Sequence, residues 1–357
     1  MQVGALAQGY LDAGGSVQLI CIDSALPAQP RLSVRAVSVP RRPFVLSSPW
    51  FILRASWETK RHGRGLIHAT GALLIPRCDV STVHFCHTAY ARRDLPIRAS
   101  RDTRWHHLNA RLTLVMNQIM ERWCYRPSRV RVLVGPSPGV ARELAEFFPQ
   151  SRGITQVIHN GIDHDRFTPS DPEARRQRKR DIGLSPDAFV AVFVGGDWRR
   201  KGLERAIRAL GQAQEWHLLV VGDGEPEPFE AIAREVGAAE RVSFLGRASE
   251  VERIYQAGDA FVFPSDYEVA PVVTYEAAAC GLPLVVTRVN GTEDLVIDGE
   301  NGWFVESPDD IAASLRELSN DADLRERMGE SARKSSADFG WAPMIESYKR
   351  LYHSLDR

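Results

Sequence analysis

Short apolar runs rich in β-branched residues alternate along the chain with segments of helical periodicity. Eleven such runs are visible, at residues 16–22, 65–70, 80–85, 130–134, 154–159, 189–196, 216–222, 241–246, 259–264, 282–287 and 302–305. Continuous apolar strands that alternate with helices are typical of parallel sheets covered on both faces. The pattern therefore predicts an α/β fold.

The longest predicted helix covers residues 104–124. Its apolar side chains recur every three or four residues and form one stripe: Trp105, Leu108, Leu112, Val115, Ile119 and Trp123. Because a soluble helix normally buries such a stripe, we expect this one to pack on the sheet of its own domain.

The chain opens on a helical pattern from Val3 to Ala13, and the first predicted strand begins only at Ser16. A doubly wound domain normally opens with a strand, and the glycine turn after it brings backbone amides to the ligand. If the first domain is of this type, its first strand, which is central in the sheet, and that glycine turn are missing. We therefore expect either a misassigned start site or a compromised first sheet.

The length of 357 residues exceeds one typical core and predicts two domains, with the boundary in the proline-flanked polar stretch 157–187. Net charge is zero overall, yet residues 1–165 hold 21 Lys and Arg against 11 Asp and Glu. This excess suggests that the first half meets something anionic. The basic run 175–180 is expected to be a solvated helix face, because no aromatic residues are interleaved with it.

The five cysteines have no paired spacing, and their odd number argues against a disulfide framework, so a reducing cytoplasm is expected. No apolar run approaches the ~18 residues that a membrane span needs, and the start lacks the pattern of a signal peptide. A peripheral membrane protein stays open. The histidines and cysteines show no zinc pattern, and neither a Walker loop nor a G-x-S-x-G elbow occurs.

The stretch DAFVFPSDYEVAPVVTYEAAACGLP (259–283) predicts a buried strand, a loop and then a helix. Pro271 suits the first turn of that helix, which should run to about Cys280 and stop at Gly281. The amides of Val272 and Val273 would then be free at the positive end of the helix dipole. Since open α/β sheets bind ligands at this edge, the stretch predicts an anion site.

Two glutamates flank this predicted anion site, Glu268 in the loop and Glu276 one turn into the helix. Ionised carboxylates only accept hydrogen bonds, so the hydroxyls of a ligand are their natural partners. A ligand with phosphate in the middle and hydroxyls at both ends is a nucleotide sugar. The alternative is that Glu268 is an ordinary loop residue and Glu276 an exposed helical one.

A second anion candidate is FVGGDWRRKGLERAIRAL (193–210), where Arg200 and Lys201 precede a helix. Lys201 can meet phosphate as a point charge and Arg200 as a bidentate donor, although bases before helices are commonly just solvated. The turn at Gly222 and Gly224 lacks the third glycine of a dinucleotide fingerprint, which disfavours a nicotinamide cofactor.

A strand-end pair of histidines lies in TVHFCHTAY (82–90). His87 falls where the loop should begin and could bond a sugar hydroxyl or support developing charge. His84 lies further inside the strand. The alternative for both is a structural histidine.

Six segments, in this order and spacing, resemble the retaining glycosyltransferases of family 4 (group 1), which have the GT-B architecture. They are VIHNGIDHDRFTP (157–169), FVGGDWRRKG (193–202), LLVVGDG (218–224), RVSFLG (241–246), DAFVFPSDYEVAPVVTYEAAACGLPLVVT (259–287) and EDLVIDGENGWFV (293–305). Bacterial lipopolysaccharide-core and cell-surface sugar transferases show the most similar pattern.

The resemblance implies two Rossmann-like doubly wound domains that face each other across a cleft, the first without its first strand. Residues 1–165 would form the acceptor-side domain and 166–340 the domain that binds the nucleotide-sugar donor. Residues 341–357 would be a helix that crosses back to the first domain. Asn160, Gly161 and Asp163 match the hinge between the domains, a structural role.

The resemblance also implies roles for single residues. Glu268 and Glu276 match the two ends of an E-x7-E motif, the first toward donor-sugar hydroxyls and the second toward ribose. Lys201 matches the diphosphate-binding lysine, and His87, followed by Thr88, resembles the histidine beside the donor sugar. The implied catalytic residues are His87, Lys201 and Glu268. The implied donor-binding residues are Thr88, Arg200, Lys201, Gly222, Val272, Val273 and Glu276.

Departures from the family pattern shift some of these roles. Relatives often have glycine where Val269 and Pro271 stand, and many carry an arginine at the position of Gly196. Phosphate contacts should therefore fall on Arg200, Lys201 and the helix amides. In relatives, the first strand and its glycine-rich turn lie against the donor phosphates and help to shape the acceptor site.

The expected reaction is metal-independent, retaining transfer of a sugar from a nucleoside-diphosphate-sugar to a hydroxyl of a glycan or glycolipid. No cofactor and no nucleic acid are implied, and the setting would be cell-envelope polysaccharide biosynthesis in the cytoplasm, at the inner face of the membrane. Arg92, Arg93, Arg98 and Arg101 could meet anionic lipid or a phosphorylated glycan. A nucleotide-sugar epimerase and a non-catalytic nucleotide-sugar-binding protein remain alternatives.

Overall fold

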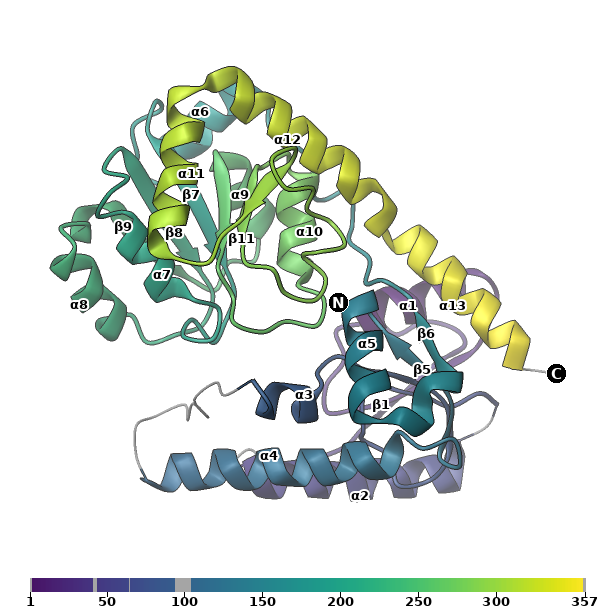
Figure 1. Cartoon of the computed structure of the whole chain (residues 1–357). Helices are drawn as coiled ribbons and strands as arrows, with labels where there is room; N and C mark the ends of the chain where they lie inside the picture. The colour runs from purple at the N-terminus through teal and green to yellow at the C-terminus, as the bar shows by residue number, and fades with distance from the viewer. Residues whose placement is uncertain (1, 41–43, 64, 94–103, 356–357) are drawn as a thin grey trace. The chain divides into compact units, whose positions relative to one another are not determined.

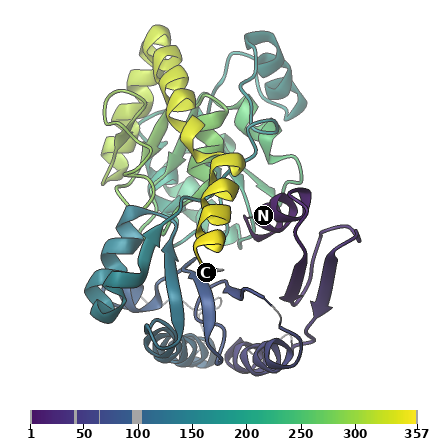
Figure 2. The ribbon, with the colours of Figure 1, turned by 90° about the vertical axis from the view of Figure 1, so that its right-hand side faces the viewer.

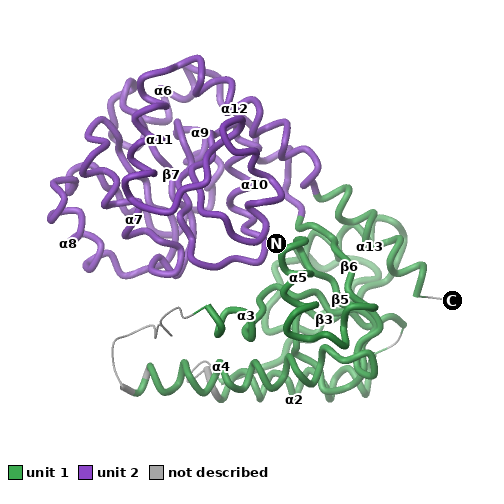
Figure 3. The backbone as a smooth tube through the Cα atoms, in the orientation of Figure 1, with its two compact units in different colours: residues 1–160, 341–357 green, residues 161–340 purple. Residues whose placement is uncertain are grey.

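The computed structural model describes residues 2–40, 44–63, 65–93 and 104–355 (Figure 1). They form two compact units, coloured separately in Figure 3. Unit 1 comprises residues 1–160 and 341–357, and unit 2 comprises Gly161–Gly340. In the described part of the chain, no helix has the length and apolar character needed to cross a membrane.

Unit 1 contains the first part of the chain and its last helix. Its elements are α1 (Gln2–Asp12), β1 (Val17–Cys21), β2 (Leu32–Ala36), α2 (Phe44–His62), β3 (His68–Ala69), β4 (Cys78–Thr82), α3 (His87–Ala91), α4 (Arg104–Cys124), β5 (Val130–Gly135), α5 (Pro138–Phe147), η1 (Pro149–Ile154), β6 (Thr155–Val157) and α13 (Trp341–Leu355). Strand β2 lies outside the predicted strand runs because it alternates polar and apolar residues. The predicted helices do not include α2, whose pattern Pro49 interrupts, nor the shorter α3 and α5.

The strands of unit 1 are all parallel but belong to two sheets, ordered β1-β2 and β3-β4-β5-β6. No strand pair joins the two sheets among the described residues. The chain enters β1 from α1, as the sequence predicts. Helix α13 packs against α1, and Tyr352 Oη lies 2.6 Å from His68 Nδ1.

Helix α4 turns its apolar stripe outward, so the prediction that the stripe packs on the sheet of its domain is wrong. Trp105, Leu112 and Ile119 keep 63%, 49% and 57% of their surfaces exposed. Two residues on the buried side of the helix are Glu121 and Cys124. Periodicity identifies the stripe, but the elements that surround a helix decide which side faces the core.

Unit 2 is built on one parallel sheet of six strands, ordered β12-β11-β10-β7-β8-β9. Its elements are α6 (Pro172–Asp181), β7 (Phe189–Val194), α7 (Leu203–Ala209), β8 (Trp216–Val221), α8 (Glu227–Glu235), η2 (Ala239–Arg241), β9 (Val242–Gly246), α9 (Val251–Ala257), β10 (Ala260–Phe263), α10 (Val272–Ala279), β11 (Leu284–Val286), β12 (Gly302–Phe304), α11 (Pro308–Asn320), α12 (Ala322–Ser336) and η3 (Ala337–Phe339). The apolar runs of β7, β8, β10 and β11 are almost completely buried and form the centre of the core.

Three helices begin with the same local signal, a Ser or Asp followed by a proline. Ser137, Asp171 and Ser307 each accept a hydrogen bond from the amide three residues later, at the starts of α5, α6 and α11. The side-chain oxygen satisfies an amide that the helix leaves without a partner, and proline suits the first turn because it has no N–H. These caps fix where α5, α6 and α11 begin.

Candidate functional site

The loops after β7 and β10 meet at one edge of the unit 2 sheet. The two strands pair directly, with Ala260 opposite Ala191 and Phe261 opposite Val192. From β7 the chain continues to β8, which pairs with one edge of β7, whereas β10 pairs with the other edge. This is the switch point of a doubly wound sheet, the place where such folds bind ligands beyond the strand ends.

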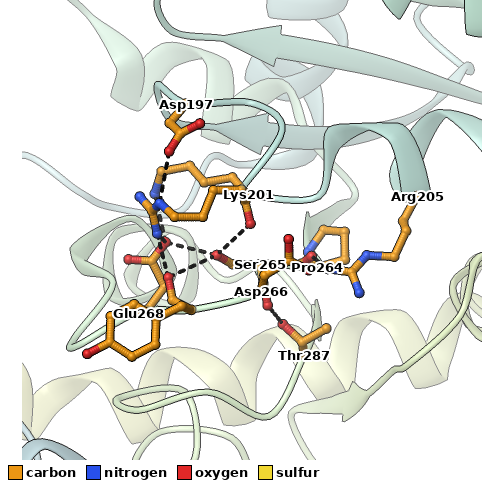
Figure 4. Close-up of polar contacts among 10 residues, drawn as sticks. Asp197, Lys201, Arg205, Pro264, Ser265, Asp266, Glu268 and Thr287 are labelled. Carbon is orange, nitrogen blue, oxygen red and sulfur yellow. Dashed lines mark hydrogen bonds and ion pairs between the residues drawn. The ribbon is translucent and has the colours of Figure 1, made fainter. Parts of the chain in front are cut away.

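Three side-chain donors from these loops converge on one oxygen of Glu268 (Figure 4). Its Oε1 accepts hydrogen bonds from Arg200 Nη1 at 3.0 Å, Lys201 Nζ at 3.1 Å and Ser265 Oγ at 3.0 Å. The side chains of Lys201 and Glu268 are only 12% and 11% exposed. Glu268 is thus a loop residue, as its alternative interpretation states, but its carboxylate is largely buried and accepts from three donors.

Backbone contacts hold Arg200 and Lys201 in place. The Arg200 carbonyl accepts from the amide of Asp266 at 2.8 Å, and the Arg200 guanidinium also donates to the carbonyl of Tyr267. Asp197, which has a left-handed φ of 47°, accepts from Arg200 Nε at 3.0 Å. Lys201 Nζ lies 4.6 Å from the ring centroid of Phe263. Both cations are thus fixed at the strand ends, toward the same carboxylate.

The charges within this cluster act on one another. Burial lowers the pKa of Lys201, and the Glu268 carboxylate only partly offsets that effect. Burial also acts against the charged form of Arg200, yet Glu268 and Asp197 together raise the Arg200 pKa above its ordinary value. Two cations and two carboxylates therefore balance each other in this cluster, and an incoming anion would compete with the carboxylates for the same N–H donors.

Two glycines allow the loops to approach so closely. A Cβ on Gly202, which has a φ of +75°, would lie 1.9 Å from the carbonyl oxygen of Pro264. A Cβ on Gly222, with a φ of +133°, would lie 2.1 Å from the carbonyl oxygen of Gly195. Gly222, which was predicted to bind the nucleotide-sugar donor, therefore allows the loops after β7 and β8 to pack closely against each other.

The predicted helix after β10 starts one residue later than expected. Helix α10 begins at Val272, and Pro271 is its N-cap residue in an extended conformation rather than part of the first turn. Val272 and Val273 therefore supply the first two helical amides, as the sequence suggests. Such amides have no hydrogen-bond partner within the helix and lie at the positive end of the helix dipole.

Glu276 is not the exposed helical residue that one alternative supposed. It is 3% exposed, and its Oε2 accepts a hydrogen bond of 3.0 Å from the hydroxyl of Tyr255. Burial raises the pKa of Glu276 to about 7, although the Tyr255 hydrogen bond and the charge of Arg166 act in the opposite direction. Glu276 thus has its own hydrogen-bond partner, separate from those of Glu268.

His87 and Thr88 open helix α3 in unit 1. The His87 amide donates to Glu121 Oε1 at 2.6 Å, and the Thr88 amide and hydroxyl donate to Glu121 Oε2 at 2.9 and 2.7 Å. The His87 imidazole lies 3.2 Å from Asn117 Nδ2, and burial lowers its pKa to about 4. A neutral imidazole is therefore held at this strand end.

Glu121 is a positioning residue that the sequence analysis missed. It is 1% exposed and lies on α4, far along the chain from the segment that it holds. The only available signal was an acid in a helix whose outward stripe is apolar. Because its carboxylate accepts three hydrogen bonds from the first turn of α3, it fixes the place of His87 and Thr88.

Of the arginines proposed to meet an anionic surface, Arg98 and Arg101 lie outside the described residues. Arg93 donates to Glu143 at 3.1 Å, and Arg92 is exposed. In the described ranges, no group of three or more His, Cys, Asp or Glu side chains could hold a metal ion. All five cysteines are free thiols.

Comparisons with known proteins cover both units. Residues 174–335 match the family Glycosyl transferases group 1, and residues 1–166 match Glycosyltransferase Family 4. A D-inositol 3-phosphate glycosyltransferase of Corynebacterium jeikeium is 34% identical over 230 residues, which are 60% of this chain and 55% of that protein. Spore coat protein SA of Bacillus subtilis is 28% identical over 245 residues, 62% of this chain and 65% of that protein. The chain thus spans about half the length of the first of these relatives.

Solved structures show the same fold at lower identity. WaaG, a glycosyltransferase involved in lipopolysaccharide biosynthesis, superposes with a TM-score of 0.83 at 20% identity, over 97% of this chain and 94% of that one. HepE of Anabaena, in complex with UDP and glucose, superposes with a TM-score of 0.75 at 17% identity, over 99% and 95%. Such likeness establishes the two-domain α/β architecture called GT-B.

Proposed function

Because the chain belongs to the group 1 glycosyltransferases, with a first half of the Family 4 type and the GT-B fold, we propose that it transfers a sugar. The donor is a nucleoside-diphosphate-sugar and the acceptor a hydroxyl of a glycan or glycolipid, with retention of the anomeric configuration. The observation that carries this proposal is the convergence of Arg200 and Lys201 on Glu268 at the switch point of unit 2. One neighbour of known structure is consistent with it, since HepE was solved in complex with UDP and glucose and with UDP-glucose.

In the proposed reaction, Arg200 and Lys201 turn from Glu268 to the diphosphate of the donor. Their charges, together with the first amides of α10, then stabilise the negative charge that develops on the leaving diphosphate. The Glu268 carboxylate, released from its cations, accepts hydrogen bonds from the hydroxyls of the donor sugar. The leaving phosphate takes the proton of the acceptor hydroxyl on the same face, which accounts for retention.

Glu276 is proposed to accept hydrogen bonds from the ribose hydroxyls of the donor. A carboxylate with a pKa of about 7 and a single tyrosine donor retains acceptor capacity for a diol. His87 is proposed to act beside the donor sugar as a neutral imidazole, since Glu121 fixes its backbone and burial lowers its pKa.

Metal independence and a cytoplasmic location at the inner face of the membrane belong to the same proposal. The two cations of the cluster supply the charge that a metal would otherwise bring to the diphosphate. Turnover should therefore persist after exhaustive dialysis against a chelator. Loss of turnover that Mg²⁺ or Mn²⁺ restores would contradict this part of the proposal.

The acceptor is the least constrained part of the reaction. The relatives named D-inositol 3-phosphate glycosyltransferases make a phosphorylated polyol the second acceptor class to test. The basic excess of residues 1–165 suits either a phosphorylated polyol or a phosphorylated glycolipid.

The test is incubation of the full chain with a panel of nucleotide sugars, with and without each acceptor class. Transfer predicts free nucleoside diphosphate that rises only when an acceptor is present. An altered sugar on intact nucleotide would instead establish an epimerase, and binding without turnover a non-catalytic binding protein. Lys201→Ala should lower the rate of nucleoside diphosphate release about 100- to 1000-fold. The matched control, which should retain the signal, is Arg208→Ala, which removes a partly exposed basic residue of α7 paired with Glu204 and Glu235.

A further inference from the structure

The outward sides of α2 and α4 carry ten large apolar side chains. They are Leu46, Trp50, Leu53 and Trp57 on α2, and Trp105, Leu108, Leu112, Val115, Ile119 and Trp123 on α4, each between 38% and 63% exposed. The two helices pack against each other and lie along the same edge of unit 1, at the bottom of Figure 2. We call this set of ten residues the apolar face of unit 1.

Helix α2 carries apolar side chains on its outward side as well as on its buried side, where Ile52 and Ala55 lie. Ser56 and Thr59 are buried, at 5% and 7% exposure, while Trp50 and Leu53 face outward at 49% and 57%. The buried hydroxyls are used, because Ser56 Oγ accepts from the amide of Ile75 at 3.0 Å and Thr59 Oγ1 donates to a carbonyl at 2.7 Å. A soluble helix normally turns its polar side to water. Exposed apolar patches of this extent mark surfaces that meet a partner.

The borders of the apolar face are basic. Arg54, Lys60 and Arg61 are exposed on α2, and Arg111, Arg122 and Arg126 on or just after α4. The two acidic residues of these helices, Glu58 and Glu121, do not neutralise this basic border, because each is engaged with other groups. Glu121 is buried and holds α3, and Glu58 lies 3.7 Å from Arg35 and 3.8 Å from His62.

Guanidinium groups also lie over the tryptophans of the apolar face. Arg129 is 4.0 Å from the ring centroid of Trp123, and Arg61 is 5.1 Å from that of Trp57. Tryptophan beside arginine is the combination that favours the boundary between lipid headgroups and acyl chains, where the ring is half buried and the cation meets phosphate.

We propose that the apolar face of unit 1 inserts into the surface of an anionic lipid bilayer, with α2 and α4 lying in the plane of the interface. Helices of 19 and 21 residues with a tryptophan-containing stripe and basic borders have the form of interfacial amphipathic helices. A second copy of the chain fits less well. A two-fold contact places the same patch on both partners, which would bring the basic borders together. The proposal does not depend on the transfer reaction.

The test is flotation of the full chain with vesicles of phosphatidylcholine alone and of phosphatidylcholine mixed with phosphatidylglycerol. We expect binding to the mixed vesicles, weakened by salt, with a blue shift of tryptophan fluorescence. Leu112→Ser with Ile119→Ser should weaken binding about tenfold or more, because both side chains enter the acyl boundary. Ile297→Ser, which changes a residue of unit 2 that is 50% exposed, should leave binding unchanged.

A second pair of changes keeps the apolar face and alters only its border. Arg54→Glu with Arg122→Glu should weaken binding to the mixed vesicles by about fivefold or more per residue, and thermal melts followed by circular dichroism should match wild type. Equal binding to both vesicle types would overturn the anionic part of the proposal. Absence of vesicle binding would overturn it entirely. If, in addition, a dimer in light scattering dissociated in the Leu112→Ser, Ile119→Ser variant, a second copy would be the partner.

Discussion

The two units use their tryptophans in opposite ways. In unit 2, Trp198 and Trp216 are 3% and 0% exposed and belong to the hydrophobic core around the single six-stranded sheet. In unit 1, Trp50 and Trp105 are 49% and 63% exposed on helices whose buried sides carry hydroxyls and a carboxylate. Unit 2 completes its own core, whereas unit 1 presents apolar surface outward, so a partner is expected only for unit 1.

The two units also differ in where their charged side chains lie. Unit 2 gathers Arg200, Lys201 and Glu268 at the ends of its central strands, where little of each side chain reaches solvent. Unit 1 instead leaves six basic residues of α2, α4 and the turn after α4 exposed around the apolar face. A partly buried cluster of fixed charges suits a small charged ligand, and a broad apolar surface with a basic border suits an extended one.

The largest expected effect separates the two classes of tryptophan. Trp216→Ala should lower the free energy of unfolding by about 3–5 kcal/mol, because it removes a fully buried ring and leaves a cavity. Trp105→Ala should change it by less than about 0.5 kcal/mol, since its ring is mostly in water. Denaturant titration of both variants measures the difference. Equal losses would mean that α4 packs inward in solution, and the comparison of the two units would fail.

That comparison also shows how far the sequence can predict this protein. The strands of unit 2 were predictable because continuous apolar runs need burial on both faces, and the loops at Lys201 and Glu268 because they follow such strands. The burial of Glu276 was not predictable, since α10 is apolar all round and no polar side marks its exposed face. The outward orientation of the apolar stripe of α4 was not predictable either, because periodicity identifies the stripe but not the elements that pack against the helix. Glu121 was missed because its partners lie some 33 residues away in sequence.

The next effect concerns the charge cluster of unit 2. Lys201→Ala should lower kcat/KM about 100- to 1000-fold, which is the usual consequence of removing one group that stabilises developing charge. Glu268→Ala should impair kcat while it spares nucleotide affinity, because its proposed contact is to the sugar. Steady-state kinetics and calorimetric titration with the nucleoside diphosphate separate the two. Unchanged kcat/KM in Lys201→Ala would remove the cluster from the reaction.

A third effect concerns the buried carboxyl of unit 2. Because the pKa of Glu276 is raised by burial to about 7, the folded state holds its proton more tightly than the unfolded state. The contribution of Glu276 is therefore fully present below about pH 4.5 and is lost as pH rises through 7. At about 1.36 kcal/mol per pKa unit, the loss is about 3 kcal/mol. Glu276→Gln has no proton to lose, so unfolding free energies of both proteins between pH 5 and 8 should diverge toward high pH. Parallel curves would contradict the raised pKa.

A ligand-binding measurement sharpens the role of the same residue. Glu276→Ala should weaken nucleotide binding about tenfold, which corresponds to the ~1.4 kcal/mol expected for a lost hydrogen bond to a charged group. Glu268→Ala should leave nucleotide binding close to wild type. Calorimetric titration of the three proteins measures this. Equal nucleotide affinity in all three would remove the proposed ribose contact from Glu276.

The smallest effect tests whether hydrogen bonding inside unit 2 tunes that carboxyl. The Tyr255 hydroxyl donates to Glu276 Oε2 at 3.0 Å, whereas the Tyr275 hydroxyl donates to the carbonyl of Gly291 at 3.3 Å. Each change to phenylalanine should cost about 1 kcal/mol of stability, the usual contribution of one such bond. The cost of Tyr255→Phe should grow as pH rises above 7, because the ionised carboxylate then loses its donor, while that of Tyr275→Phe should stay constant. Identical pH profiles would mean that Tyr255 only packs, and that burial alone sets the pKa of Glu276.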